Sequence, residues 1–111
     1  MEIQFHTAQL ARLCNSEAAL NSRYGPDCAK RIRRRLQQLE AVESLMDMTF
    51  GRPCELEAEQ AGQISLDLVG PLRLIARPTA DPPPRKPDGA LRHSKVRSMT
   101  ILEIADTDHR R

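Results

Sequence analysis

Apolar side chains recur every three or four residues between positions 27 and 48, which is the spacing of one face of an α-helix. They are Cys28, Ile32, Leu36, Leu39, Val42 and Met46. Gly25 and Pro26 stand just before this stretch, and the pair favours a break because glycine ends helices and proline fits a first helical turn. A shorter helical stretch covers 7–24 and is interrupted at Ser16, a residue that caps helix N-termini well. The first half therefore predicts two consecutive helices that form a hairpin.

Near residue 50 the apolar period changes from about 3.6 to 2, which is typical of strands with one buried face. Apolar and polar residues then alternate in three consecutive runs, 54–58, 63–69 and 72–77. Consecutive strands joined by short turns, such as the one at Gly70-Pro71, predict an antiparallel sheet. Residues 2–5 and 99–106 are expected to add a first and a last strand. The whole pattern predicts an α+β domain: an N-terminal strand and a two-helix hairpin packed on an antiparallel β-sheet.

A proline-rich segment, 78–97, separates the last two of these strands. Five of the eight prolines fall between Pro78 and Gly89. Proline lacks the N–H that a helix or a central strand needs, so we expect a loop insertion that serves either as a spacer or as a docking element. With 111 residues the chain has room for one domain, and we predict a single domain over 1–111.

The composition and the motifs that are missing exclude several classes of function. Aromatic residues make up 3%, too few for the stacking platforms of single-strand nucleic-acid binders. Cys14, Cys28 and Cys54 form no Cys-x-x-Cys pair, and the histidines show no metal-ligand spacing, so we expect neither a metal site nor a cofactor. Neither a membrane span nor a signal peptide is evident, which predicts a cytoplasmic protein with reduced thiols.

Short motifs in a fixed order cover almost the whole chain. They are Leu13-Cys14-Asn15-Ser16, Tyr24-Gly25, Arg35-Leu36-x-x-Leu39-Glu40-Ala41, Gly62-Gln63-x-Ser65-x-Asp67-Leu68-Val69-Gly70-Pro71-x-Arg73-Leu74-Ile75, Pro84-Arg85-Lys86-x-Asp88-Gly89 and Ile101-x-Glu103-Ile104-x-Asp106. In content and order the chain resembles the HigB-like killer toxins of the RelE/ParE superfamily. The resemblance implies a RelE/ParE-like fold.

The resemblance also implies a function, that of the toxin of a type II toxin–antitoxin system. Such a toxin is usually a ribosome-dependent mRNA endoribonuclease that works without metal or cofactor and inhibits translation. Its implied partners are the ribosome with its mRNA and a helix-turn-helix, HigA-like antitoxin. Operator DNA is implied as a partner only through this antitoxin. Metal-free RNA cleavage needs a base for the 2′-hydroxyl proton, a cation for the phosphoryl charge and an acid for the leaving oxygen.

Members of the family place these tasks on a sheet arginine, on a histidine near the start of the second strand of the sheet, and on a C-terminal Asp-Tyr-His sequence. Arg73 matches the arginine and Asp106 matches the aspartate. Cys54 stands where many members have the histidine, and the alternative for it is a buried structural thiol. The resemblance therefore implies catalytic roles for Arg73, Asp106 and Cys54.

The C-terminal sequence departs from the family pattern. Thr107 replaces the tyrosine and Asp108 stands where the final histidine would be, while His109 follows one position later. Gln60 stands where the family often has a basic residue. We predict an acid–base or positioning role for His109. Two other functions stay open: a weakened toxin-fold module that binds an antitoxin without cleaving RNA, and a gyrase-directed toxin of the ParE branch.

Positive charge is concentrated in patches. The chain has 17 Lys+Arg against 15 Asp+Glu, so any attraction to phosphate has to come from local clusters. We predict contacts with RNA or the ribosome for Lys30, Arg31, Arg34, Arg35, Arg77, Lys95 and Arg97. For the four residues on the long predicted helix, the alternative is the solvated face of an amphipathic helix.

Overall fold

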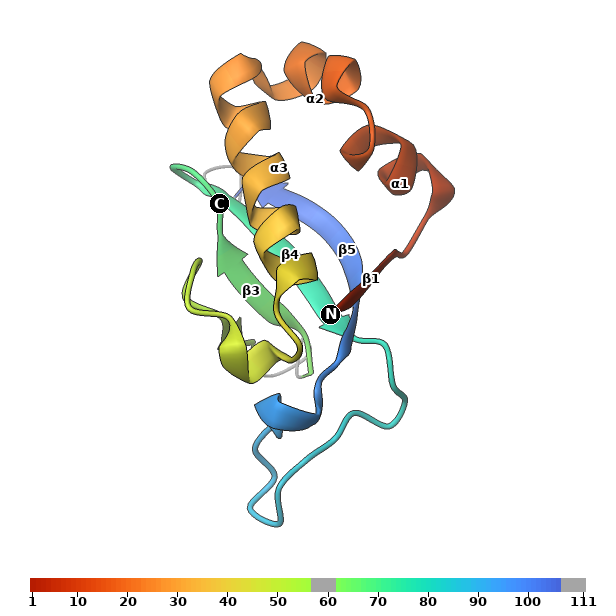
Figure 1. Ribbon diagram of the computed structural model, residues 1–111, viewed down its shortest axis with the longest axis vertical. Coiled ribbons are helices and arrows are strands. Elements are labelled where there is room, and N and C mark those ends of the chain that lie inside the picture. The colour runs from red at the N-terminus through yellow and green to blue at the C-terminus, as the bar shows by residue number, and fades with distance from the viewer. Residues whose placement is uncertain (57–61, 107–111) are drawn as a thin grey trace.

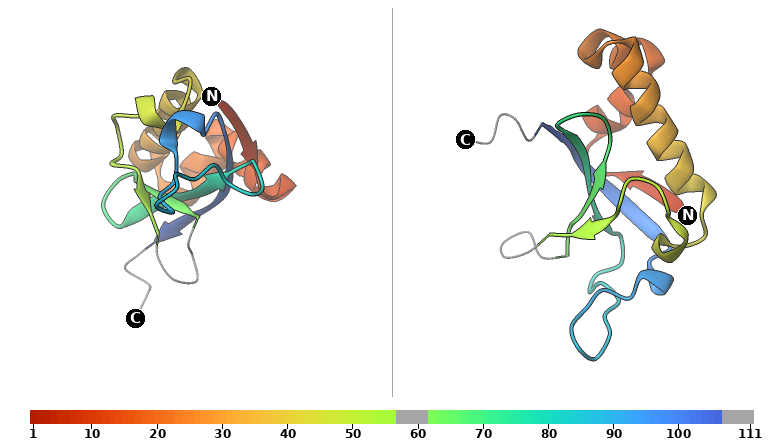
Figure 2. Two further views of the ribbon diagram at one scale, coloured as in Figure 1. Left: turned by 90° about the horizontal axis from the view of Figure 1, so that it is seen from below. Right: turned by 90° about the vertical axis from the view of Figure 1, so that its left-hand side faces the viewer.

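The computed structural model describes residues 1–56 and 62–106, which form one layer of helices packed on one sheet (Figure 1). The helices are α1 (Ala8–Cys14), α2 (Glu17–Tyr24) and α3 (Pro26–Ala41), and short 3₁₀ turns occupy Leu45–Asp47 and His93–Lys95. The strands are β1 (Glu2–Phe5), β2 (Cys54–Glu55), β3 (Ile64–Asp67), β4 (Leu72–Pro78) and β5 (Ser98–Asp106). The helices lie on one side of the sheet, and in the described part of the chain no helix covers the other side (Figure 2).

The predicted two-helix hairpin is wrong, because the described residues form three helices. Ser16 begins α2 separately from α1, since its hydroxyl oxygen accepts a hydrogen bond from the Ala19 N–H at 3.1 Å. Gly25 separates α2 from α3 with φ 85° and ψ 158°, a conformation that other residues almost never adopt. Pro26 follows as the first residue of α3, as the sequence predicted.

Helix α3 is shorter than the apolar period over 27–48 predicted. It ends at Ala41, and the next residue, Val42, is already extended. Beyond it, the Leu45 N–H donates to the Val96 carbonyl oxygen at 2.9 Å, which ties this stretch to a distant loop. Leu45 is buried, while Met46 of the predicted helical stripe is 67% exposed.

The sheet is mixed rather than purely antiparallel, and its strand order is β1-β5-β4-β3-β2. The predicted antiparallel neighbours are confirmed, with Ser65 of β3 opposite Ile75 of β4. Strand β1 pairs parallel with β5, from Glu2 opposite Ser98 to Phe5 opposite Ile101. Parallel pairing needs a long crossover, which the helices and the meander between these two strands provide. The α+β class is confirmed.

Strand β2 is the short edge strand of the sheet. Of the predicted run 54–58, it comprises Cys54 and Glu55, and residues 57–61 lie outside the described part. Cys54 is exposed, so the alternative of a buried structural thiol is wrong. The reason is its place at the sheet edge, because its side chain projects from the side of the sheet that no described helix covers.

One hydrophobic core lies between the helices and the sheet, and it reaches into the proline-rich segment. Leu39 of α3, Leu74 of β4 and Ile101 of β5 are fully buried in it, and each such side chain contributes about 1.5–3 kcal/mol. Leu91 and Val96 belong to the same cluster. The segment 78–97 is therefore more than a spacer, and it begins inside β4. Among residues 1–56 and 62–106, none of the helices combines the length and the apolar character that a membrane span requires.

Candidate functional site

Arg73 lies on the side of the sheet that no described helix covers. Its neighbours Leu72 and Leu74 are buried in the core, so alternation along β4 turns Arg73 to the opposite face. There its guanidinium lies 2.6 Å from an Asp67 carboxylate oxygen and donates to the Ser65 hydroxyl at 3.2 Å. Asp67 is also the residue directly opposite Arg73 in the register of β3 and β4. Arg73 is therefore held in one orientation by its neighbours on β3.

Asp67 connects three arginines. Its second carboxylate oxygen accepts hydrogen bonds from Arg52 at 2.6 and 2.8 Å, and its backbone carbonyl accepts one from Arg35 Nε at 2.9 Å. Arg52 is 86% exposed and Asp67 28%, so the Arg52 pair lies at the surface. We call Arg52, Ser65, Asp67 and Arg73 the Asp67 cluster. Two guanidinium groups share one carboxylate in it, which leaves one positive charge in excess.

Cys54 and Arg77 lie on the same side of the sheet as the Asp67 cluster. Cys54 is opposite Ser65 in the register, which gives the two side chains the same face. Arg77 follows Ala76, a core residue, and therefore points away from the core, where it donates to the Pro78 carbonyl at 3.2 Å. The structure thus brings Cys54 and Arg73 to one face of the sheet.

Asp106 does not join them. It is opposite Leu72 in the register of β4 and β5, whereas Arg73 is opposite Ala105, so Asp106 and Arg73 project from opposite faces of the sheet. Asp106 is instead one of the groups that shift the pKa of Tyr24, at the end of α2. Burial raises the pKa of Tyr24, Arg23 opposes this, and the charges of Cys14 and Asp106 add to it. His109, Thr107, Asp108 and Gln60 lie outside the described residues.

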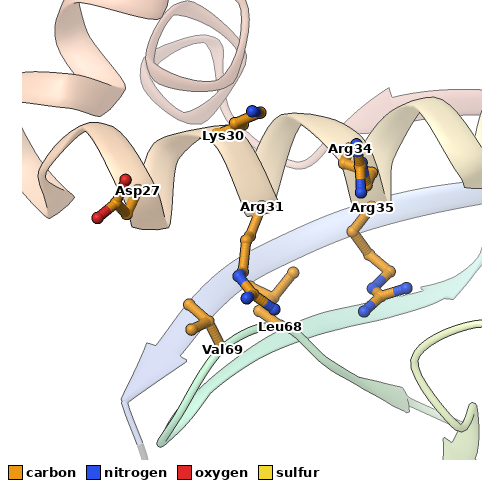
Figure 3. Close-up of a pocket in the computed structure, with 7 residues that line it drawn as sticks. All are labelled: Asp27, Lys30, Arg31, Arg34, Arg35, Leu68 and Val69. Carbon is orange, nitrogen blue, oxygen red and sulfur yellow. The ribbon is translucent and has the colours of Figure 1, made fainter.

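The basic residues of α3 form a groove on the helix side of the molecule. The groove runs between α3 and the turn from β3 to β4, has a volume of about 530 Å³, and appears in Figure 3. We call it the α3 groove; its lining is Asp27, Lys30, Arg31, Arg34, Arg35, Leu68 and Val69. Burial lowers the pKa of Arg35, Asp67 opposes this shift, and the positive charge of Arg31 adds to it.

The predicted RNA-contacting residues do not share one surface. Four of them line the α3 groove, and Arg77 lies on the other side of the sheet. Lys95 and Arg97 lie beside Pro78, the last residue of β4. Along the strand, Pro78 is roughly 15 Å from Arg73. Sequence reasoning missed Asp67 as the residue that pairs with Arg73 and Arg52. The available signal was the spacing of Ser65-x-Asp67, because residues two apart on a strand project from the same face.

Within residues 1–56 and 62–106, no three His, Cys, Asp or Glu side chains gather as metal ligands would. Comparisons of the chain with family models, with curated proteins and with solved structures find no match.

Proposed function

We propose that this chain is the toxin of a type II toxin–antitoxin pair, of the HigB-like kind, and that it acts on mRNA at the ribosome. The ordered motifs of the sequence support this. So does the element order, an N-terminal strand followed by helices and then by an antiparallel meander. The observation that carries the proposal is Arg73, a cation held by Ser65 and Asp67 on the sheet side that the described helices leave uncovered.

Arg73 would stabilise the phosphoryl group as negative charge builds up during cleavage. A preorganised cation is most effective when it does not have to reorient, and the contacts with Ser65 and Asp67 supply that order. The carboxylate of Asp67 repels phosphate, but Arg52 already shares this carboxylate. When a phosphate approaches Arg73, Arg52 keeps Asp67 paired, so the carboxylate is not left without a counter-charge.

A second function, antitoxin binding without RNA cleavage, is favoured by the register of β4 and β5. Because Arg73 and Asp106 project from opposite faces, the cation and that aspartate do not meet at one phosphate. Cys54 in place of a histidine removes a further proton-transferring group from this face. For this function the chain would keep a helix-turn-helix antitoxin as its partner, and co-expression followed by size exclusion is expected to give one joint peak.

The test is induced expression of the wild type and of Arg73→Ala, with growth and pulse labelling as the measurements. Wild type is expected to stop protein synthesis before DNA synthesis, whereas a gyrase-directed toxin stops DNA synthesis first. Removing one preorganised charge commonly costs about 10²–10³ in rate, so Arg73→Ala should no longer arrest growth. Arg12→Ala, an exposed change on α1, is the matched control and should stay toxic.

Two results would decide against cleavage at Arg73. If Arg73→Ala arrests growth as fully as the wild type, the Asp67 cluster is not the site. If the wild type cleaves no mRNA in primer extension, the binding function takes its place. Cys54→His then tests whether the cysteine marks a weakened site. If it does, the histidine found in the family should raise mRNA cleavage.

A further inference from the structure

The α3 groove combines positive walls with an apolar floor. Lys30 and Arg34, like Arg31 and Arg35, are four residues apart and so lie one helical turn from each other on the same helix. In Figure 3, Arg31 and Arg35 extend from α3 toward the strands, where Leu68 and Val69 line the same groove. Four cations and one carboxylate, that of Asp27, line the groove, which leaves an excess of three positive charges.

Most of this charge is not balanced inside the described part of the molecule. Arg35 is used by the fold, since it donates to the Asp67 carbonyl and to the Gln38 side chain. Among residues 1–56 and 62–106, no carboxylate forms an ion pair with Lys30, Arg31 or Arg34. By contrast, Arg33 on the same helix pairs with Glu17 of α2 at 3.4 Å. Like charges one turn apart repel each other, so an anionic occupant would relieve this repulsion.

We propose that the α3 groove is the docking site for an acidic segment of a partner protein, one that carries apolar side chains between its carboxylates. The carboxylates would pair with Lys30, Arg31 and Arg34, and an apolar side chain would cover Val69. Glutamates one helical turn apart repeat at the same distance as the cations of α3, so a short acidic helix matches the groove in charge and in spacing.

RNA fits the groove less well than an acidic peptide. No aromatic side chain lines it, so bases have no ring to stack on. Val69 is only partly buried, and a phosphate chain offers its exposed part no apolar contact, whereas a peptide side chain does. The inference takes from the proposed function only the idea of a protein partner. It does not depend on RNA cleavage, because the Asp67 cluster lies on the other side of the sheet.

The experiment measures fluorescence anisotropy of labelled probes added to the full chain. The main probe is a short synthetic peptide of paired glutamates and paired leucines. A second peptide has serine in place of each leucine, and a single-stranded RNA of matching charge is the third probe. Tighter binding of the glutamate–leucine peptide than of the other two, weakened by salt, is expected.

Arg31→Ala/Arg34→Ala should weaken binding of the glutamate–leucine peptide about fivefold or more, because two exposed charge pairs are lost. Alanine keeps the helix, and circular dichroism confirms the fold of the variant. The control Arg12→Ala/Lys86→Ala removes the same charge from exposed positions outside the groove and should leave the affinity nearly unchanged. Val69→Ser should weaken the leucine peptide but not the serine peptide.

Three outcomes overturn the proposal: tighter binding of the RNA than of the leucine peptide, equal loss in the control variant, or no loss in Arg31→Ala/Arg34→Ala. Arg73→Ala should bind the peptide as the wild type does. A chain that fails to arrest translation but still binds the peptide therefore contradicts the proposed RNA cleavage and leaves the groove assignment standing.

Discussion

At the scale of single residues, Asp67 joins several arginines at the side of the sheet that the described helices leave uncovered. One carboxylate pairs with Arg73 and Arg52, and the carbonyl of the same residue accepts a hydrogen bond from Arg35. Arg52 reaches it from a turn with φ 45°, an uncommon conformation for a residue with a side chain. The alternation of β4 predicted which way Arg73 points. It did not predict the partner, because a periodic pattern assigns a face to a side chain and nothing more.

Cys14 is a second residue whose environment has a measurable consequence. Burial raises the pKa of the Cys14 thiol from 9.0 to about 11. As the pH rises through 9.0, the unfolded chain loses this proton first while the folded chain keeps it, so the folded state loses stability. The contribution of the protonated Cys14 thiol to the free energy of unfolding is complete below pH 9.0 and is lost as the pH approaches 11.

We therefore expect the free energy of unfolding of the wild type to fall toward pH 11 more than that of Cys14→Ala, by up to about 2–3 kcal/mol. Denaturant unfolding at several pH values measures this difference. Cys54→Ala, at an exposed thiol, is the control and should follow the wild type. Parallel pH profiles for the wild type and Cys14→Ala would contradict the prediction.

At the scale of elements, local chemistry determines where helices begin, and a distant contact holds the chain after α3 ends. Ser16 caps α2 through its own side chain, and Gly25 and Pro26 separate α2 from α3. These signals lie within a few residues of the break, so the sequence contains them. After α3 ends at Ala41, the chain is held by the hydrogen bond from Leu45 to Val96, a contact between distant segments that no local pattern encodes.

Gly25→Ala should destabilise the protein by about 1–3 kcal/mol, because φ 85° with ψ 158° is strained for any residue with a Cβ. No atom lies within 4 Å of the added Cβ, so the loss would come from the backbone and not from a clash. Thermal unfolding measures it, and each kcal/mol lowers the Tm by about 4–8 °C in a domain of this size.

Ser22→Ala, an exposed change in the same helix, is the matched control for Gly25→Ala and should alter the Tm little. An unchanged Tm in Gly25→Ala would mean that the chain relaxes this turn without strain.

At the scale of the whole molecule, the proline-rich segment contributes to the core and binds the stretch that follows α3 through the hydrogen bond from Leu45 to Val96. Leu91 and Val96 are buried beside residues of the helices and the sheet. Within the segment, Arg85 pairs with Leu91 across an isolated bridge, and its guanidinium lies 3.2 Å from a carboxylate oxygen of Glu55, a residue of β2. The segment therefore ties the start of β5 to the far edge of the sheet.

Leu91→Ala is expected to destabilise the protein by about 2–5 kcal/mol, because a buried leucine is replaced by a cavity. Urea denaturation measures the shift of the midpoint. Pro87→Ala, an exposed change in the same segment, serves as the control and should leave the midpoint close to the wild type. A midpoint for Leu91→Ala equal to that of Pro87→Ala would show that the segment is only a spacer.

The sequence by itself determined the α+β class, the break at Gly25, the pairing of β3 with β4 and the outward direction of Arg73. Each of these follows from periodicity or from turn residues, which act over a few positions. The tertiary structure alone decided the parallel pairing of β1 with β5 and the burial of Leu91. It also decided the contact of Arg73 with Asp67 and the separation of Arg73 from Asp106. These features depend on strand register and on packing between segments far apart in the chain, where the free energy comes from contacts that no single stretch of sequence contains.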